Sequence, residues 1–246
     1  MDDRPTARQQ SEPSSSPLHS WLRALAITLL GCLLLGLGCF VVLGTILPQR
    51  MNLYSAAVWQ QLCFTVALAA ILAIIILWQR ARGSSLADLG WGKPTTTITL
   101  TLGVLLGAAY IAGSYFGARH VLPGVNALEF HWIRLVLAPL GILMAVAEET
   151  MMRGFFMTEL QRGRVATWLQ IVASGACSAV YHSFQNPTIE GFLPSFVLFS
   201  LHAGLYVLGR RSLTPTILAH SIYHVFGEPY LLMMAMVAAG QASAGS

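Results

Sequence analysis

Charged residues are scarce in this chain: Asp, Glu, Lys and Arg make up 10% of its 246 residues, whereas hydrophobic residues make up 55%. Soluble domains carry roughly 25% charged residues, so the composition excludes an ordinary soluble protein. Apolar runs of about 20 residues, the length that crosses ~30 Å of hydrocarbon, recur along nearly the whole sequence. The sequence therefore predicts an all-α fold, a polytopic helical bundle in the lipid bilayer.

The sequence also lacks the patterns of a cysteine-based metal site and of a cleaved signal peptide. The four cysteines lie in apolar runs, without the close pairing of a metal-binding knuckle, and we expect buried free thiols at Cys32, Cys39, Cys63 and Cys177. The net charge of +4 is interpreted as a consequence of membrane topology, and no nucleic-acid partner is expected. The polar N-terminus is too long and too acidic for a signal peptide, so the first apolar run is predicted to be an uncleaved anchor.

About eight transmembrane helices are predicted, near residues 22–46, 54–78, 97–117, 132–158, 166–184, 192–209, 213–227 and 229–241. With the N-terminus in the cytoplasm, the outside loops hold only Arg50 and Arg119. The inside segments hold nine basic residues: Arg4, Arg8, Arg80, Arg82, Lys93, Arg162, Arg164, Arg210 and Arg211. This bias predicts that both termini are cytoplasmic. The short loops and compact chain are typical of a bacterial plasma-membrane protein.

The domain organisation follows from these spans. Residues 1–20, rich in Ser and Pro, are predicted to be a disordered cytoplasmic tail, and residues 21–246 a transmembrane domain. The third span carries Gly103, Gly107, Gly113 and Gly117, a spacing that favours close helix packing in lipid. The preceding segment, "SSLADLGWGKP", indicates an interfacial helix or elbow.

Three ionisable residues interrupt the fourth span in the stretch "AEETMMRGFF". In a helix, Glu149 and Arg153 are four residues apart and share a face, whereas Glu148 is rotated about 100° away. A charge at the bilayer centre costs at least ~2.5–3.5 kcal/mol. The Glu149–Arg153 pair offsets part of that cost. Glu148 is left to face a cavity and, as a hypothesis, to move protons.

Histidines occur in later spans. His182 is in "SAVYHSF", and "LAHSIYH" puts His220 and His224 four residues apart on one helix face. Together with Glu148 these residues indicate a shared polar site. His202 in the sixth span has no partner at helical spacing, so we interpret it as a packing residue.

These motifs resemble those of the CPBP family of CAAX prenyl proteases and bacteriocin-processing enzymes. "EETMMRG" is similar to the family's E-E-x-x-x-R motif, and "RRSLTPTILAHSIYH" is similar to its final motif. The resemblance runs from about Leu86 to Phe226, and we place a peptidase core at about 86–228. It implies an eight-helix intramembrane peptidase.

The resemblance also implies roles for individual residues. Glu148 and His182 would activate the attacking water, and His220 with position 224 would stabilise the oxyanion. Glu149 and Arg153 would support the site. The chain departs from the family pattern twice: Ser178 stands where the second motif usually has Phe, and His224 where the last motif usually has Asn or Asp.

The predicted activity is hydrolysis of peptide bonds in membrane-associated substrates, such as prenylated proteins, leader peptides or other membrane proteins. No cofactor is required by this mechanism. Glu148, His182, His220 and His224 are nevertheless a credible zinc set, although the sequence has no H-E-x-x-H motif. A metalloprotease, a catalytically impaired scaffold or immunity protein, and a proton-coupled transporter are the alternatives.

Overall fold

The computed structural model describes residues 16–41, 53–121, 132–182 and 189–227. Every regular element within these ranges is helical, which confirms the predicted all-α class for the described part of the chain. The elements are α1 (Pro17–Val41), α2 (Leu53–Ala81), the 3-10 helix η3 (Leu86–Leu89), α3 (Thr97–Val121), α4 (Ile133–Glu149), the π-helix η4 (Thr150–Phe156), α5 (Met157–Arg162), α6 (Thr167–His182), α7 (Ile189–Leu208) and α8 (Thr214–Phe226).

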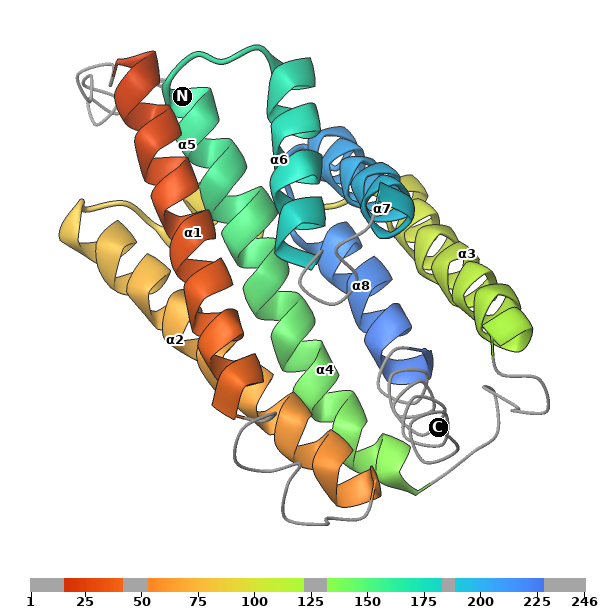
Figure 1. Cartoon of the computed structure of the whole chain (residues 1–246). Helices are drawn as coiled ribbons and strands as arrows, with labels where there is room; N and C mark the ends of the chain where they lie inside the picture. The colour runs from red at the N-terminus through yellow and green to blue at the C-terminus, as the bar shows by residue number, and fades with distance from the viewer. Residues whose placement is uncertain (1–15, 42–52, 122–131, 183–188, 228–246) are drawn as a thin grey trace.

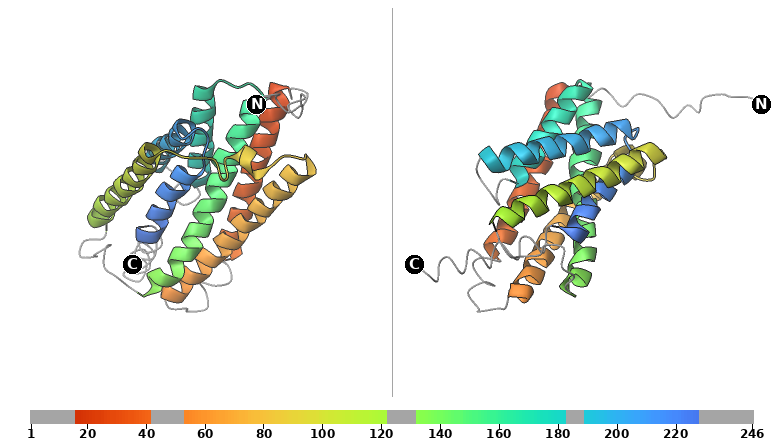
Figure 2. Two further views of the ribbon diagram at one scale, coloured as in Figure 1. Left: turned by 180° about the vertical axis from the view of Figure 1, so that it is seen from behind. Right: turned by 90° about the vertical axis from the view of Figure 1, so that its right-hand side faces the viewer.

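The α4–η4–α5 segment forms one continuous rod through the bundle (Figure 1). Helices α1 and α2 pack on one side of this rod and α8 on the other, with α3 against α8 and α7 against α6. The right-hand view of Figure 2 shows α3 and α7 crossing the rod steeply. The rod therefore contacts α1, α2, α6 and α8 directly, whereas α3 and α7 pack mainly against α8 and α6.

In the described part of the chain, five helical stretches are long and apolar enough to cross a bilayer: Pro17–Gly38, Ala57–Ala81, Thr97–Phe116, Ile133–Arg162 and Gly191–Leu208. They coincide with five of the eight predicted spans. Helices α6 and α8 lie at two others, but with 16 and 13 residues they are shorter than the ~20 that span the hydrocarbon. The eighth predicted span, 229–241, and residues 1–15 of the predicted tail lie outside the described residues.

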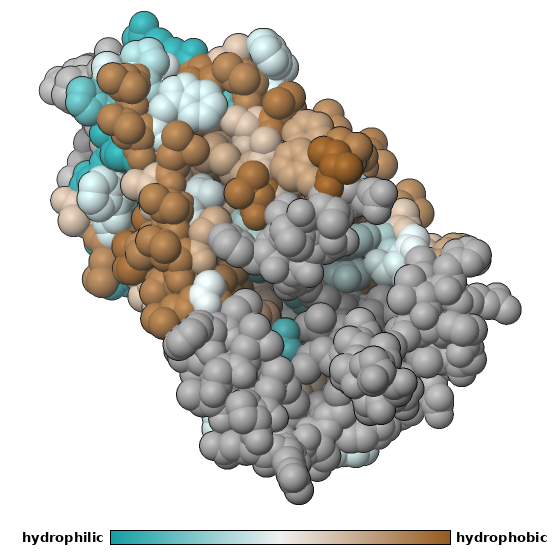
Figure 3. Space-filling model, viewed as in Figure 1, coloured by the Kyte–Doolittle hydropathy of each residue, from teal (hydrophilic) through white to brown (hydrophobic). Residues whose placement is uncertain are grey.

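The surface agrees with a membrane setting. Hydrophobic side chains cover the face formed by α1, and hydrophilic groups gather at the end where α1 begins (Figure 3). Large apolar residues such as Leu29, Leu33 and Leu77 are about 60% exposed, as expected for side chains that contact lipid rather than water. The protein is therefore an integral membrane protein. Cys32, Cys63 and Cys177 are free thiols, of which Cys32 is buried.

The glycines of α3 pack as the sequence predicts at two of their positions. A Cβ added at Gly103 would lie 2.5 Å from the carbonyl oxygen of Pro215, and one at Gly107 would lie 2.7 Å from that of Ala219. Only glycine allows the backbones of α3 and α8 to approach this closely. At Gly113 an added Cβ would meet nothing within 4 Å, so this glycine makes no comparable contact.

The predicted elbow contains the 3-10 helix η3, in which Leu86, Ala87 and Asp88 are exposed and Leu89 anchors the helix to the end of the bundle. Leu89 is fully buried, and its carbonyl oxygen accepts a hydrogen bond of 3.2 Å from the hydroxyl of Tyr206. Gly90 has φ 101°, and its carbonyl oxygen accepts a 3.1 Å bond from the amide of Leu213. These contacts fix the start of α8 against the base of α7.

A second group of charges joins three helices at the same end. The carboxylate of Glu159 is fully buried and contacts Arg23 at 2.6 Å, Arg82 at 2.8 Å and Arg162 at 2.6 Å. These arginine side chains remain 27%, 23% and 19% exposed, respectively. One acid therefore ties α1, the end of α2 and α5 together. Local spacing indicates only the Glu159–Arg162 pair, while the contacts with Arg23 and Arg82 are tertiary.

Candidate active site

The polar site begins where the central rod changes helix type. Directly after Glu149 the backbone widens into the π-helix η4, all seven residues of which are buried. Short π-helical stretches inside α-helices are rare and frequently mark functional sites. Gly154 lies within this stretch, and a Cβ there would sit 3.0 Å from the carbonyl oxygen of Leu89. The glycine thus allows the π-helix to pack against η3.

Glu149 and Arg153 form the buried ion pair that the sequence predicts. The Arg153 Nε lies 3.3 Å from the Glu149 Oε2, and the two side chains are 1% and 0% exposed. Arg153 Nη2 also donates a 3.0 Å hydrogen bond to the carbonyl oxygen of Phe199, and the guanidinium lies 5.2 Å from the centre of the Phe199 ring. The cation therefore links the rod to α7.

Glu148 faces α6 and α8 instead. The hydroxyl of Tyr181 donates a 3.1 Å hydrogen bond to Glu148 Oε1. The other carboxylate oxygen, Oε2, lies 3.7 Å from His182 Nε2 and 3.5 Å from His220 Nε2. Among the described residues, Oε2 has no hydrogen-bond partner. The carboxylate is thus oriented through one oxygen, while the other points at two imidazole nitrogens.

His220 lies between the two glutamates. Its Nδ1 is 3.0 Å from Glu149 Oε1, and because a carboxylate only accepts hydrogen bonds, Nδ1 carries the hydrogen. Nε2 then faces Glu148. The ring of His224 stacks on that of His220 with 4.7 Å between ring centres. A Cβ at Gly141 would lie only 2.7 Å from the Cβ of His224, so this glycine makes room for the second imidazole.

His182 is oriented in the same way as His220. Its Nδ1 lies 2.8 Å from the carbonyl oxygen of Ser178, which can only accept, so Nδ1 donates and Nε2 faces Glu148. The Phe199 ring packs on the imidazole with 4.3 Å between ring centres. An aromatic contact to His182 thus comes from α7, although Ser178 replaces the aromatic residue of the family motif.

The structure brings all six sequence-predicted site residues together, from the central rod, α6 and α8. It adds three that the sequence analysis missed: Tyr181, Phe199 and His202. Tyr181 precedes His182 in the chain, and this adjacency was the available signal. His202 is 2% exposed and its ring centre lies 5.7 Å from that of His220. The contact with His220 joins α7 to α8, so helical spacing along one helix could not reveal it.

Part of the site also has the donor atoms of a metal site. One ligand atom each from Glu148, His220 and His224 lie within 4.8 Å of one another, and all three side chains are buried. Two imidazoles and a carboxylate are a ligand set that suits Zn²⁺. His182, the fourth residue of the predicted set, contacts Glu148 but is not part of this group of three.

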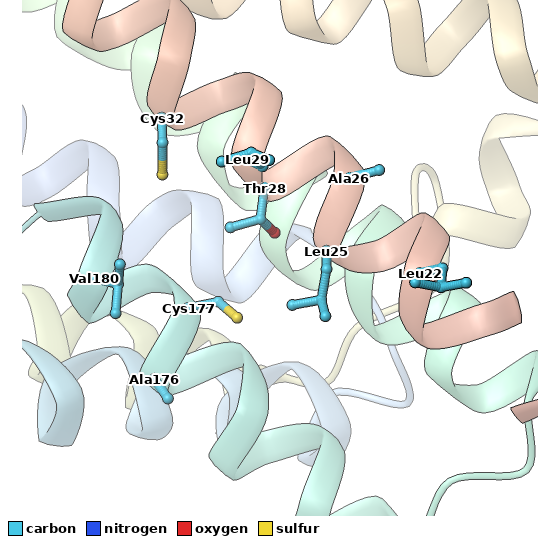
Figure 4. A pocket seen from close by; sticks show the side chains of 9 residues that line it. All are labelled: Leu22, Leu25, Ala26, Thr28, Leu29, Cys32, Ala176, Cys177 and Val180. Atoms are coloured by element: carbon cyan, nitrogen blue, oxygen red, sulfur yellow. The ribbon is translucent and has the colours of Figure 1, made fainter. Parts of the chain in front are cut away.

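An apolar groove of about 530 Å³ lies between α1 and α6 (Figure 4). Its lining includes Leu25, Leu29, Cys177 and Val180. None of its lining residues belongs to the polar site. The groove and the Glu/His cluster are therefore separate features of the bundle.

Comparison with protein families identifies the class of this site. Residues 130–226 match the family model of the type II CAAX prenyl endopeptidases, Rce1-like. This stretch contains every residue of the Glu/His cluster. The part of the chain that holds the site is thus similar to the CAAX prenyl endopeptidases, as its motifs indicate. The match begins at 130 rather than at about 86, where the sequence resemblance begins. Comparisons with curated proteins and with solved structures gave no match.

Proposed function

We propose that this protein is an intramembrane endopeptidase in which Glu148 and His182 activate water. The observation that carries the proposal is the placement of Glu148 Oε2, which has no hydrogen-bond partner among the described residues and lies 3.7 Å from His182 Nε2. Polar atoms separated by more than about 3.5 Å are commonly bridged by water. A water molecule between them would meet two proton acceptors.

In the proposed reaction this water attacks the carbonyl carbon of the scissile peptide bond and gives a proton to Glu148. The carbonyl oxygen becomes an oxyanion, and the proton is then delivered to the leaving nitrogen as the C–N bond breaks. Tyr181 keeps the carboxylate oriented through Oε1. A general base in such a position contributes about 10²–10⁴ to the rate.

His220 and His224 are proposed to stabilise the oxyanion. His220 lies 3.0 Å from Glu149 and 3.5 Å from Glu148, so two carboxylates can compensate an imidazolium there. In that form Nε2 carries a hydrogen and donates it. Charge-assisted donors in a water-poor site are the kind of group that stabilises developing negative charge. Glu149 and Arg153 support the site by holding His220 in place.

The family match favours prenylated membrane substrates, and the motif resemblance adds leader-type substrates. We infer a plasma-membrane location with both termini in the cytoplasm. Mid-membrane acids and imidazoles are costly unless they serve a function. Their convergence favours an enzyme over the alternative of an impaired scaffold or immunity protein, because a scaffold needs no such cluster.

The test is cleavage by purified protein in proteoliposomes, with a panel of farnesylated CAAX peptides and leader peptides. We expect the Glu148→Gln variant to lose at least about 100-fold in kcat/KM while its thermal unfolding stays cooperative. Asp88→Asn is the matched control, because it makes the same chemical change at an exposed carboxylate. Normal cleavage by Glu148→Gln would exclude the proposed base, and an inactive wild type against every substrate would favour the scaffold.

A further inference from the structure

Two acceptor atoms face each other in the site without a hydrogen between them in the neutral state. His220 Nδ1 carries its hydrogen toward Glu149 Oε1 at 3.0 Å. Its Nε2 then presents a lone pair to Glu148 Oε2, 3.5 Å away. Two such acceptors repel unless a positive charge lies between them. In the proposed mechanism that charge is a proton, and a metal ion can take the same position.

From this arrangement we infer that Glu148, His220 and His224 bind a divalent transition-metal ion of the zinc class, and that the bound ion inhibits the peptidase. The inhibitory part rests on the proposed function, because the ion would occupy the Glu148 oxygen and the His220 nitrogen that the reaction uses. The binding part does not depend on it.

The distances suit such an ion. Zinc–nitrogen and zinc–oxygen bonds are about 2.0–2.1 Å, which places neighbouring ligand atoms of a tetrahedral ion about 3.3 Å apart. The 3.5 Å between Glu148 Oε2 and His220 Nε2 is close to that value, and the His224 ligand atom lies within 4.8 Å of both. Small side-chain movements would close the set.

The surroundings of His220 also resemble those of a metal ligand. Ligating histidines usually donate their other ring N–H to a carboxylate, which fixes the tautomer and makes the ligating nitrogen more basic. Glu149 supplies that carboxylate, and it is in turn held by Arg153 at 3.3 Å. Imidazole ligands favour Zn²⁺ over Mg²⁺ or Ca²⁺, which prefer oxygen atoms.

His224 is what makes the site particular to this chain. The family motif usually has Asn or Asp there, and an Asn side chain is a poor ligand for zinc. With His224 stacked on His220 at 4.7 Å, the chain presents two imidazoles and a carboxylate. A family-like His224→Asn variant should therefore keep a hydrogen-bond donor and lose the metal site.

Binding is measured with Co²⁺ on the full-length, chelator-treated protein in detergent, using the visible absorption of cobalt in low-coordinate sites. We expect one Co²⁺ per chain, displaced by Zn²⁺. His224→Asn and Glu148→Gln should each weaken binding more than about 100-fold, beyond the 10–100-fold that loss of an outer-shell partner causes. His202→Asn, a change at a buried histidine outside the three, should keep binding.

Inhibition is measured separately, as cleavage relative to each variant's own zinc-free rate. Wild type should lose activity as one Zn²⁺ binds, and His224→Asn should need at least about 100-fold more zinc. Unchanged cobalt binding in both variants would overturn the site. Activation of the wild type by zinc, as in a zinc-dependent peptidase, would overturn the inhibitory part. Cobalt binding is measured without substrate turnover. A protein that binds cobalt but cleaves no substrate would therefore contradict the proposed peptidase function and not the metal site.

Discussion

The carboxylates of Glu148 and Glu149, adjacent in the chain, lie against opposite nitrogens of one imidazole. Glu149 Oε1 is 3.0 Å from Nδ1 of His220, and Glu148 Oε2 is 3.5 Å from its Nε2. The two acids have different second partners, Arg153 for Glu149 and Tyr181 for Glu148. The two adjacent glutamates thus have different surroundings. Glu149 forms a structural ion pair, whereas Glu148 faces the imidazoles of the site.

The hydrogen bond from Tyr181 is predicted to orient the proposed base. Removing a hydrogen bond to a charged group costs about 1.5–3 kcal/mol, so Tyr181→Phe should lower kcat about 10–100-fold and change KM little. Single-substrate kinetics in proteoliposomes measure this. Tyr115→Phe, which removes a hydroxyl from a different helix, α3, is the control. Equal activities of Tyr181→Phe and wild type would show that the bond has no role in turnover.

The room that Gly141 leaves for His224 gives a test of positioning. Gly141→Ala adds a Cβ that would lie 2.7 Å from the Cβ of His224, so the imidazole must move. Since a displacement of about 1 Å can cost about 100-fold in rate, we expect a loss of 10–100-fold in kcat. Gly113→Ala is the matched control, because its added Cβ meets nothing within 4 Å. Equal losses in both variants would point to a general effect of alanine.

The buried Glu149–Arg153 pair should matter for folding as well as for the site. Removing one member of a buried pair leaves the other charge uncompensated and costs about 3–5 kcal/mol. We expect Glu149→Gln to lower thermal stability strongly, and Glu149→Gln combined with Arg153→Met to recover part of the loss. Thermal unfolding of the purified variants measures this. A double variant less stable than either single one would contradict the pairing.

Glu159 should stabilise the end of the bundle far from catalysis. Its carboxylate is fully buried among Arg23, Arg82 and Arg162, so Glu159→Gln leaves three cations crowded together. Because these arginines keep some exposure to solvent, we expect the free energy of unfolding to fall by about 3 kcal/mol, the lower end of the range for broken buried pairs. Unfolding temperatures should fall, with Asp88→Asn unchanged. In the fraction that stays folded, kcat should equal that of wild type, and a selective loss of kcat would link this cluster to the site.

Much of the architecture could be predicted because hydrophobicity acts locally. The 25 residues of α1 and the 29 of α2 are apolar enough to be recognised without any knowledge of their neighbours. The positions of α6 and α8 were also predicted, from the shorter apolar segments 166–184 and 213–227. In the bundle α6 packs against α7, and α8 packs against α3 and α4, so contacts with neighbouring helices cover part of the surface of each short helix.

The sequence by itself determined that the chain is a membrane helical bundle and which acids and histidines meet in its polar cluster, because composition, motif spacing and the i, i+4 geometry of Glu149 with Arg153 are local properties. Only the tertiary structure decided which nitrogen of His220 faces which glutamate, that Tyr181, Phe199 and His202 join the site, and that Glu159 collects three arginines. Those contacts join different helices, and they depend on helix tilt and on the π-helical turn after Glu149. Neither is encoded in the spacing of residues along one helix.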